Sequence, residues 1–154
     1  MSSTYTFGGR LTNAADQLLV PSAPYDRNLV PAPVPGGILY SAVTAWGIPL
    51  PSARTIRNMG LLCEGTSLQD VVVTVQIQSL VHVSFGNYQC NPIPFTQLSL
   101  TFPGAASGMS RCSTIISSLS AACSTGEILA VRLTLGASPT GTNIIASVTF
   151  DTSL

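Results

Sequence analysis

Apolar and polar residues alternate with a period of two in several stretches of the second half of the chain. The clearest stretch runs from Val71 to Ile77, where every second residue is valine or isoleucine and residues 74 and 76 are polar. Residues 97–102, 129–135 and 144–150 repeat this pattern. Because successive side chains of a β-strand point to opposite faces, each stretch predicts a strand with one buried and one solvated face.

The rest of the chain predicts weaker strands and no sustained helix. Tyr5–Leu11, Asp16–Val20, Ile38–Ile48 and Arg54–Cys63 have the composition of strands, while Ser113–Ala122 fits a helix and a strand equally well. Glycine, proline and asparagine occupy the positions between the alternating stretches, as turns require.

About eight such strands with inward apolar faces need two packed layers, because a single sheet would leave one apolar face in water. We therefore expect an all-β fold, an antiparallel jelly-roll β-sandwich. Residues 21–37 hold five of the eleven prolines, which predicts an extended arm. We divide the chain into residues 1–37, an N-terminal strand with the Pro-rich arm, and residues 38–154, the jelly roll.

Charge is scarce. Only 8 % of the 154 residues are charged, against about 25 % in average domains. All six basic residues are arginine, and the formal net charge is zero. So little positive charge argues against nucleic acid as a partner. The chain has no run of 18 apolar residues and no charged start followed by an apolar stretch, so we expect no membrane span and no secretory signal.

Four cysteines, Cys63, Cys90, Cys112 and Cys123, allow three ways of forming two disulfides, and spacing alone does not rank them. The 26, 21 and 10 residues between neighbours do not resemble zinc-binding CxxC pairs, and one histidine is too few for a mixed site. Structural disulfides and buried thiols both remain open. We expect no metal and no cofactor.

The residues that could support catalysis are isolated. His82 lies at the end of the clearest strand, and Glu64 and Asp70, the one close acidic pair, flank a short loop. Nucleophilic catalysis requires an activated nucleophile beside a base, and glycoside hydrolysis requires two carboxylates about 5–10 Å apart. A strand histidine and a solvated turn are the simpler interpretations, so we expect no enzyme.

Low charge and apolar content predict self-association. The edges of a β-sandwich need protection, lysine is a common edge guard, and this chain has none. We therefore expect a homo-oligomer in which residues 21–37 lie across a neighbouring subunit. Large apolar residues beside turns are the expected contacts between subunits. These are Tyr25, Leu29, Val30, Val34, Trp46, Leu61, Phe85 and Tyr88.

Four segments carry a resemblance to a known family: Gly47–Met59, Val71–Ile77, Ile93–Pro103 and Gly126–Leu135. Together they resemble the C-terminal jelly-roll domain of the collagen-like exosporium glycoproteins of bacterial spores, over about residues 38–151. The resemblance implies a trimer of the tumour-necrosis-factor or C1q type, without catalysis, on the outermost surface of a spore. Unlike that family, this sequence has no Gly-X-Y tract before the domain.

The expected function is accordingly that of a structural protein that assembles, as a trimer or a larger symmetric array, on the spore surface. A virion structural protein (capsid, decoration, fibre or tail tip) is the alternative, and other surface-layer or virion proteins could be partners. A carbohydrate-binding module is the second alternative. It would require aromatic residues such as Trp46 and Tyr88 to cluster, and nothing in the sequence places them together.

Overall fold

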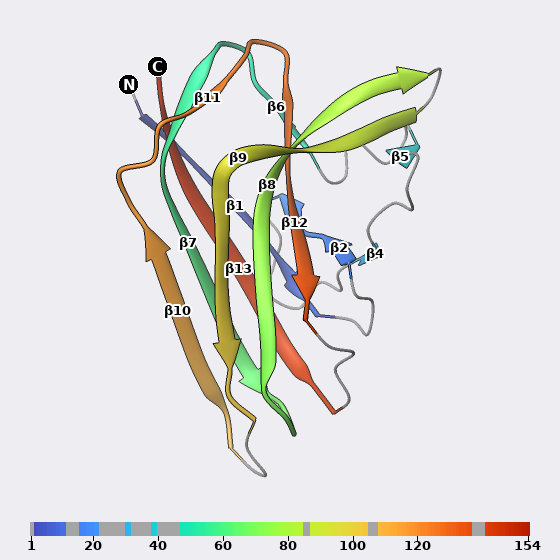
Figure 1. Ribbon diagram of the computed structural model, residues 1–154, viewed down its shortest axis with the longest axis vertical. Coiled ribbons are helices and arrows are strands. Elements are labelled where there is room, and N and C mark those ends of the chain that lie inside the picture. Colours follow the sequence, from blue (N-terminus) through green and yellow to red (C-terminus); the bar gives the residue numbers. More distant parts are fainter. Residues whose placement is uncertain are drawn as a thin grey trace.

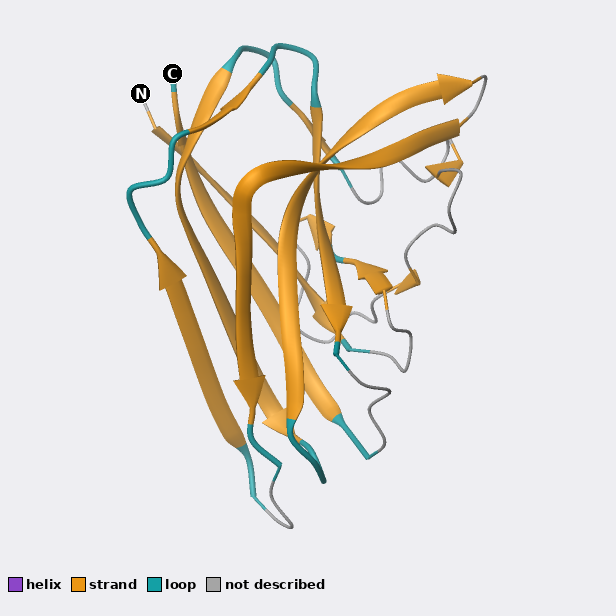
Figure 2. Ribbon diagram, viewed as in Figure 1, coloured by secondary structure: helices purple, strands orange, loops and turns teal. Residues whose placement is uncertain are grey.

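The computed structural model describes residues 2–11, 16–21, 30–31, 38–39, 47–84, 87–104, 108–136 and 141–154. These residues form β-strands joined by turns and loops (Figure 2), and none of them is helical. No helix within these ranges could cross a membrane. The strands make two sheets, called sheet A and sheet B below, and every strand pair in them is antiparallel.

Sheet A has the strand order β10–β7–β13–β1–β3, and β11 also pairs with β7. Its strands are β1 (Ser2–Arg10), β3 (Val20–Pro21), β7 (Arg54–Thr66), β10 (Ser110–Ile116), β11 (Ala121–Cys123) and β13 (Asn143–Ser153). The ambiguous segment Ser113–Ala122 is thus strand at both ends, with a short connection between β10 and β11.

Sheet B has the order β4–β2–β12–β8–β9–β5, and β6 also pairs with β12. Its strands are β2 (Asp16–Leu18), β4 (Val30–Pro31), β5 (Ile38–Leu39), β6 (Ile48–Pro49), β8 (Val71–Ser84), β9 (Asn87–Phe102) and β12 (Ile128–Leu135).

The pairing of the main strands is nested. The first strand β1 pairs with the last strand β13, β2 pairs with β12, β7 with β10, and β8 with β9 (Figure 1). A chain folded back on itself as four such pairs, then wrapped into two layers, is a jelly roll. The predicted antiparallel jelly-roll β-sandwich is therefore confirmed.

The N-terminal part of the chain contributes to both sheets. β1 follows β13 from Ser2 opposite Ser153 to Arg10 opposite Ile145, and β2 pairs with β12. The two parts that we separate at residue 37 are thus hydrogen-bonded to each other. This register also brings the two ends of the chain to the same end of the sandwich (Figure 1). Apart from Pro21, Val30 and Pro31, the predicted Pro-rich arm lies outside the described residues.

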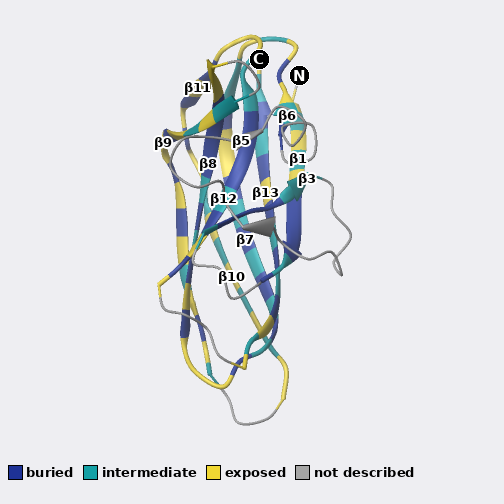
Figure 3. Ribbon diagram, turned by 90° about the vertical axis from the view of Figure 1, so that its right-hand side faces the viewer, coloured by how far each residue is buried: buried dark blue, intermediate teal, exposed yellow. Residues whose placement is uncertain are grey.

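The core lies between the sheets, and the alternating pattern of the sequence accounts for it. Val71, Val73, Val75 and Ile77 are at most 2 % exposed, and buried positions alternate with exposed ones along the strands in Figure 3. From sheet A, the ring of Phe7 stacks on that of Phe150 at 5.8 Å between centroids. A smaller cluster of Leu18, Leu80 and Ala130 packs separately from this core.

Candidate interaction surface on sheet A

The outward side chains of sheet A form a face of small and apolar residues. Leu62 of β7 lies opposite Ser147 of β13 and Ser113 of β10. Directly opposed residues of an antiparallel pair point to the same face, so each such row shares one side of the sheet. We define the sheet A outer face by ten residues of this kind. They are Thr6, Gly60, Leu62, Glu64, Arg111, Ser113, Ile115, Ile145, Ser147 and Thr149.

Three pairs of adjacent apolar residues give this face its character. Leu61–Leu62, Ile115–Ile116 and Ile144–Ile145 each interrupt the alternation of apolar and polar positions. Leu61 and Ile144 are buried and Ile116 packs against the core, so the other member of each pair must point outward. The registers place Ile145, Leu62 and Ile115 on a diagonal across β13, β7 and β10, and Ile115 is 76 % exposed. We call these three residues the apolar stripe.

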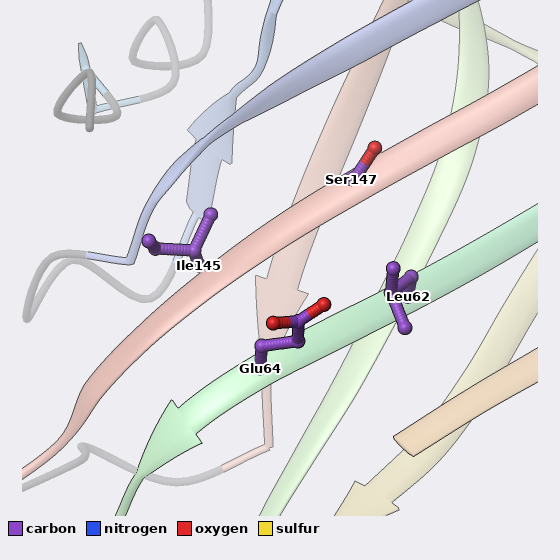
Figure 4. Close-up of a pocket in the computed structure, with 4 residues that line it drawn as sticks. All are labelled: Leu62, Glu64, Ile145 and Ser147. Atoms are coloured by element: carbon purple, nitrogen blue, oxygen red, sulfur yellow. The ribbon is translucent and has the colours of Figure 1, made fainter. Parts of the chain in front are cut away.

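Two hollows lie along this stripe. The first has a volume of about 270 Å³ and is lined by Leu62 and Glu64 from β7 and by Ile145 and Ser147 from β13 (Figure 4). The second, of about 440 Å³, shares Leu62 and Ser147 with the first and extends to Ile115 on β10. The face is therefore hollowed where its apolar side chains lie.

The residues that line the hollows are mainly small or apolar. Apart from Glu64 and Arg111, glycine, serine, threonine, leucine and isoleucine line them. Arg111 Nε lies 3.3 Å from Glu64 Oε1, with side chains 71 % and 42 % exposed. An ion pair this exposed contributes little to stability. The described residues of this lining include no histidine or cysteine, and their surface can be buried against another protein.

A separate depression, of about 440 Å³ and polar, lies on the outer side of sheet B. Arg132 binds Asp16 through Nη2 at 2.9 Å and Nε at 3.1 Å, and the Thr134 hydroxyl donates to Asp16 at 2.9 Å. The hydrogen bond from Arg132 is the main reason why the pKa of Asp16 is lowered, with burial opposing it. The rest of the lining consists of Thr74, Pro92 and three glutamines: Gln76, Gln78 and Gln97.

All four cysteines are free thiols, and the structure brings two of them together. Cys63 and Cys112 are register partners across β7 and β10. Burial raises the pKa of the Cys63 thiol to about 12, and the neighbouring Cys112 adds to the effect. Burial also raises the pKa of Cys123, to about 11, and that of Cys90.

The structure describes only some of the residues that we predict as contacts between subunits. Leu61 is wrong, because it is 1 % exposed and packs inside the core. Tyr88 is half-buried, with its ring edge-on to that of His82 at 5.4 Å. The strand β4 contains Val30, whose side chain is not described. The others lie outside the described residues: Tyr25, Leu29, Val34, Trp46 and Phe85.

Glu64 and Asp70, the acidic pair of the sequence, have separate structural contacts. Glu64 faces outward beside Arg111, whereas Asp70 accepts a hydrogen bond of 2.8 Å from the backbone N–H of Gly104. Asp70 thereby links the residues just before β8 to those just after β9. Within the described ranges, no three histidine, cysteine or acidic side chains gather as metal ligands would.

Comparison with known proteins gives likeness of fold at most. No protein-family model and no curated protein matches the chain. An isomalto-dextranase of Arthrobacter globiformis T6, solved with panose, is 12 % identical with a TM-score of 0.41, over 97 % of this chain and 23 % of that one. The infectious bursal disease virus Gx strain is 12 % identical with a TM-score of 0.35, over 99 % and 33 %.

The VP2 subviral particle of infectious bursal disease virus is 13 % identical with a TM-score of 0.21, over 99 % of this chain and 42 % of that one. This chain thus spans less than half the length of each of these solved proteins. At such identities and TM-scores, the likenesses assign neither a family nor a function to this chain.

Proposed function

We propose that this chain is a non-enzymatic structural protein that assembles with copies of itself through the sheet A outer face. The observation that carries the proposal is the apolar stripe of Ile145, Leu62 and Ile115, which three neighbouring strands present on one side of the sheet. The solvent-facing positions of a strand are normally polar. Three apolar side chains in a line therefore expose apolar surface to water, and association with another copy would bury that surface.

A second copy is the occupant that fits this face best. The formal net charge is zero, so two copies do not repel each other as highly charged chains would. Small side chains such as Ser147 and Gly60 flank the stripe and let a partner approach the sheet closely. A stable interface buries roughly 800 Å² on each partner, so the whole face must take part and not the stripe alone.

For the location, we propose the outer surface of a particle. The resemblance of residues 38–151 to exosporium domains supports a bacterial spore, and the virion remains the alternative. The physical reasoning is the same for both, since each coat is built from repeated copies. The neighbouring genes separate the two cases: spore-coat genes would support the first, and capsid or tail genes the second.

The test of self-assembly is the mass of the native protein at micromolar concentration, measured by light scattering. We expect an oligomer for the natural chain and a monomer for Gly60→Arg. The Gly60 site tolerates a side chain within the subunit, because the nearest atom to an added Cβ is 3.8 Å away. An arginine there would instead occupy the space needed by a partner.

Thr101→Arg is the matched control, since Thr101 is an exposed residue of β9 on the other sheet. This control should leave the native mass unchanged. Both variants should unfold in a cooperative thermal transition like that of the natural chain, which shows that each subunit is folded. A monomeric natural chain, or an oligomeric Gly60→Arg variant, would contradict the proposal.

Carbohydrate binding is a second candidate, supported by the depression on sheet B. Gln78 is 2 % exposed and lines that depression, and its Oε1 has no hydrogen-bond partner. Side-chain amides both donate and accept, as the hydroxyl groups of a sugar do, and Asp16 and Arg132 neutralise each other, which favours a neutral ligand. A glycan array should then show binding that Gln76→Ala weakens; an array without signal would exclude this candidate.

A further inference from the structure

We propose that Cys63 and Cys112 form a disulfide between β7 and β10 when the protein meets an oxidising environment. The inference does not depend on the proposed function. It ranks the three disulfide pairings that the sequence leaves open.

The strand register supplies the geometry. Cys63 and Cys112 are directly opposed in an antiparallel pair, so their side chains point to the same face. Cys63 is 0 % exposed, and Cys112 packs against the same core cluster. Opposed residues have Cα atoms about 4.5 or 5.5 Å apart, depending on their position in the ladder, and both separations lie within the roughly 4.4–6.8 Å that a disulfide spans.

The other two cysteines have no comparable partner. Cys123 lies opposite Arg54, nine positions before Cys63 on β7, a separation of about 30 Å along the strand. Cys90 packs against the separate cluster of Leu18, Leu80 and Ala130. It lies near Arg132, whose positive charge partly offsets the effect of burial on the pKa of Cys90. Among the four cysteines, only Cys63 and Cys112 are placed to react with each other.

The reaction is thiol–disulfide exchange with a small disulfide such as oxidised glutathione. The half-buried Cys112 is the thiol that such a reagent can reach, and its thiolate attacks one sulfur and releases one glutathione thiolate. The Cys63 thiolate then attacks the Cys112 sulfur and releases the second glutathione. Two protons leave the protein, two glutathione thiols form, and the protein loses two electrons.

The second step should be slow. Cys63 is fully buried and its pKa is raised to about 12, so little thiolate exists at neutral pH. Formation of the bond therefore requires β10, which lies at one edge of the described part of sheet A, to open briefly. Once formed, the bond would join this edge strand to β7 and enclose β8 and β9 in a covalent loop.

The test is incubation of the folded chain with oxidised glutathione, followed by peptide mapping without reduction. We expect one cross-link, between the peptides of Cys63 and Cys112, and a melting temperature raised by roughly 5–15 °C. The rise in melting temperature on oxidation should persist in Cys90→Ser and Cys123→Ser. It should disappear in Cys112→Ser, which lacks one of the two thiols.

Four unreacted thiols after prolonged oxidation, or a bridge that includes Cys90 or Cys123, would overturn the inference. The peptide map of the natural chain decides this even if Cys112→Ser fails to fold. Native mass is a separate measurement, so failure of the disulfide and failure of self-assembly are distinguishable.

Discussion

At the scale of single residues, Phe95 has the least favourable backbone conformation in β9. Its φ is +67°, in the left-handed region, and its side chain is 83 % exposed. It lies where β9 inserts extra residues between the partners of Gln76 and Gln78. The buried Thr96 next to it fixes this bulge, because its hydroxyl donates to the carbonyl of Ile93 at 2.7 Å.

Phe95→Gly should therefore stabilise the protein by about 0.5–1 kcal/mol. Relief of the left-handed conformation gains about 1–2 kcal/mol, which exceeds the roughly 0.5–1 kcal/mol that glycine loses in chain entropy. Phe95→Ala is the control, since it removes the ring and keeps the Cβ. Urea unfolding measures both, and a gain of equal size in the alanine variant would contradict the backbone explanation.

Gly65→Ala should destabilise the fold strongly. Gly65 has a φ of +144°, and an added Cβ would lie 2.0 Å from the Asn143 carbonyl oxygen of the neighbouring strand. We expect a loss of about 2–4 kcal/mol. Gly60→Ala, in the same strand with only ordinary van der Waals contacts at its Cβ, should not destabilise the fold, because alanine loses about 0.5–1 kcal/mol less chain entropy than glycine. Similar losses in the two variants, measured by thermal unfolding, would argue against the steric cause.

Asp16 should make stability depend on acidic pH. Its pKa in the folded chain lies below the ordinary 3.8, so its contribution is present at neutral pH and is lost as the pH falls through the lowered value. Because the Asp16 and Arg132 side chains are 40 % and 38 % exposed, the contribution is below about 1 kcal/mol. Asp16→Asn should cost this amount at pH 7 and progressively less as the pH falls below 3.8, in urea unfolding; a cost that does not change with pH would contradict the assignment.

The sequence predicts which side chains are buried where apolar and polar residues alternate, and it does not where two apolar residues are adjacent. The parity of Val71–Ile77 identified four core residues correctly. The doublet Leu61–Leu62 has no such parity, because either leucine could face inward until the register with β13 is known. Leu61 is therefore expected at the surface only from its size and its place beside a turn, and Leu62, which lines both hollows together with Ser147, is not identified.

At the scale of elements, β1 holds the two parts of the chain together. It lies inside sheet A between β13 and β3, and its Phe7 is fully buried against Phe150. A chain that starts at residue 38 should therefore fail to fold cooperatively, since β13 would lose β1 as its partner from Ile145 to Ser153 and keep only β7.

Near-ultraviolet circular dichroism and thermal melting would detect this failure. Phe7→Ala in the full chain is the milder counterpart and should cost about 3–5 kcal/mol. A fragment 38–154 that melts in a single sharp transition would instead show that the jelly roll folds without its first strand.

The strands themselves were largely predictable, and their pairing was not. Alternation located β8, β12 and β13, because it depends on neighbouring residues alone. The pairing of β1 with β13 joins residues 2–10 to residues 145–153, and no local pattern encodes such a distant contact. Expecting a jelly roll required the global argument that the apolar faces must cover each other.

At the scale of the whole molecule, the proposed assembly should resist salt. The sheet A outer face combines an apolar stripe with a single exposed ion pair, Glu64–Arg111, so screening removes little of the attraction. Light scattering at about 0.1 M and 1 M sodium chloride should give the same native mass. Dissociation at the higher concentration would mean that charged residues, and not the stripe, hold the copies together.

The neighbouring ends of the chain have a consequence for anything attached to it. Because Ser2 pairs with Ser153, a tether fused to either end leaves from one pole of the molecule. The opposite pole, where β7 turns into β8, stays clear of both attachments (Figure 1). An anchored copy would therefore point its far loops outward, whichever end is used as the point of attachment.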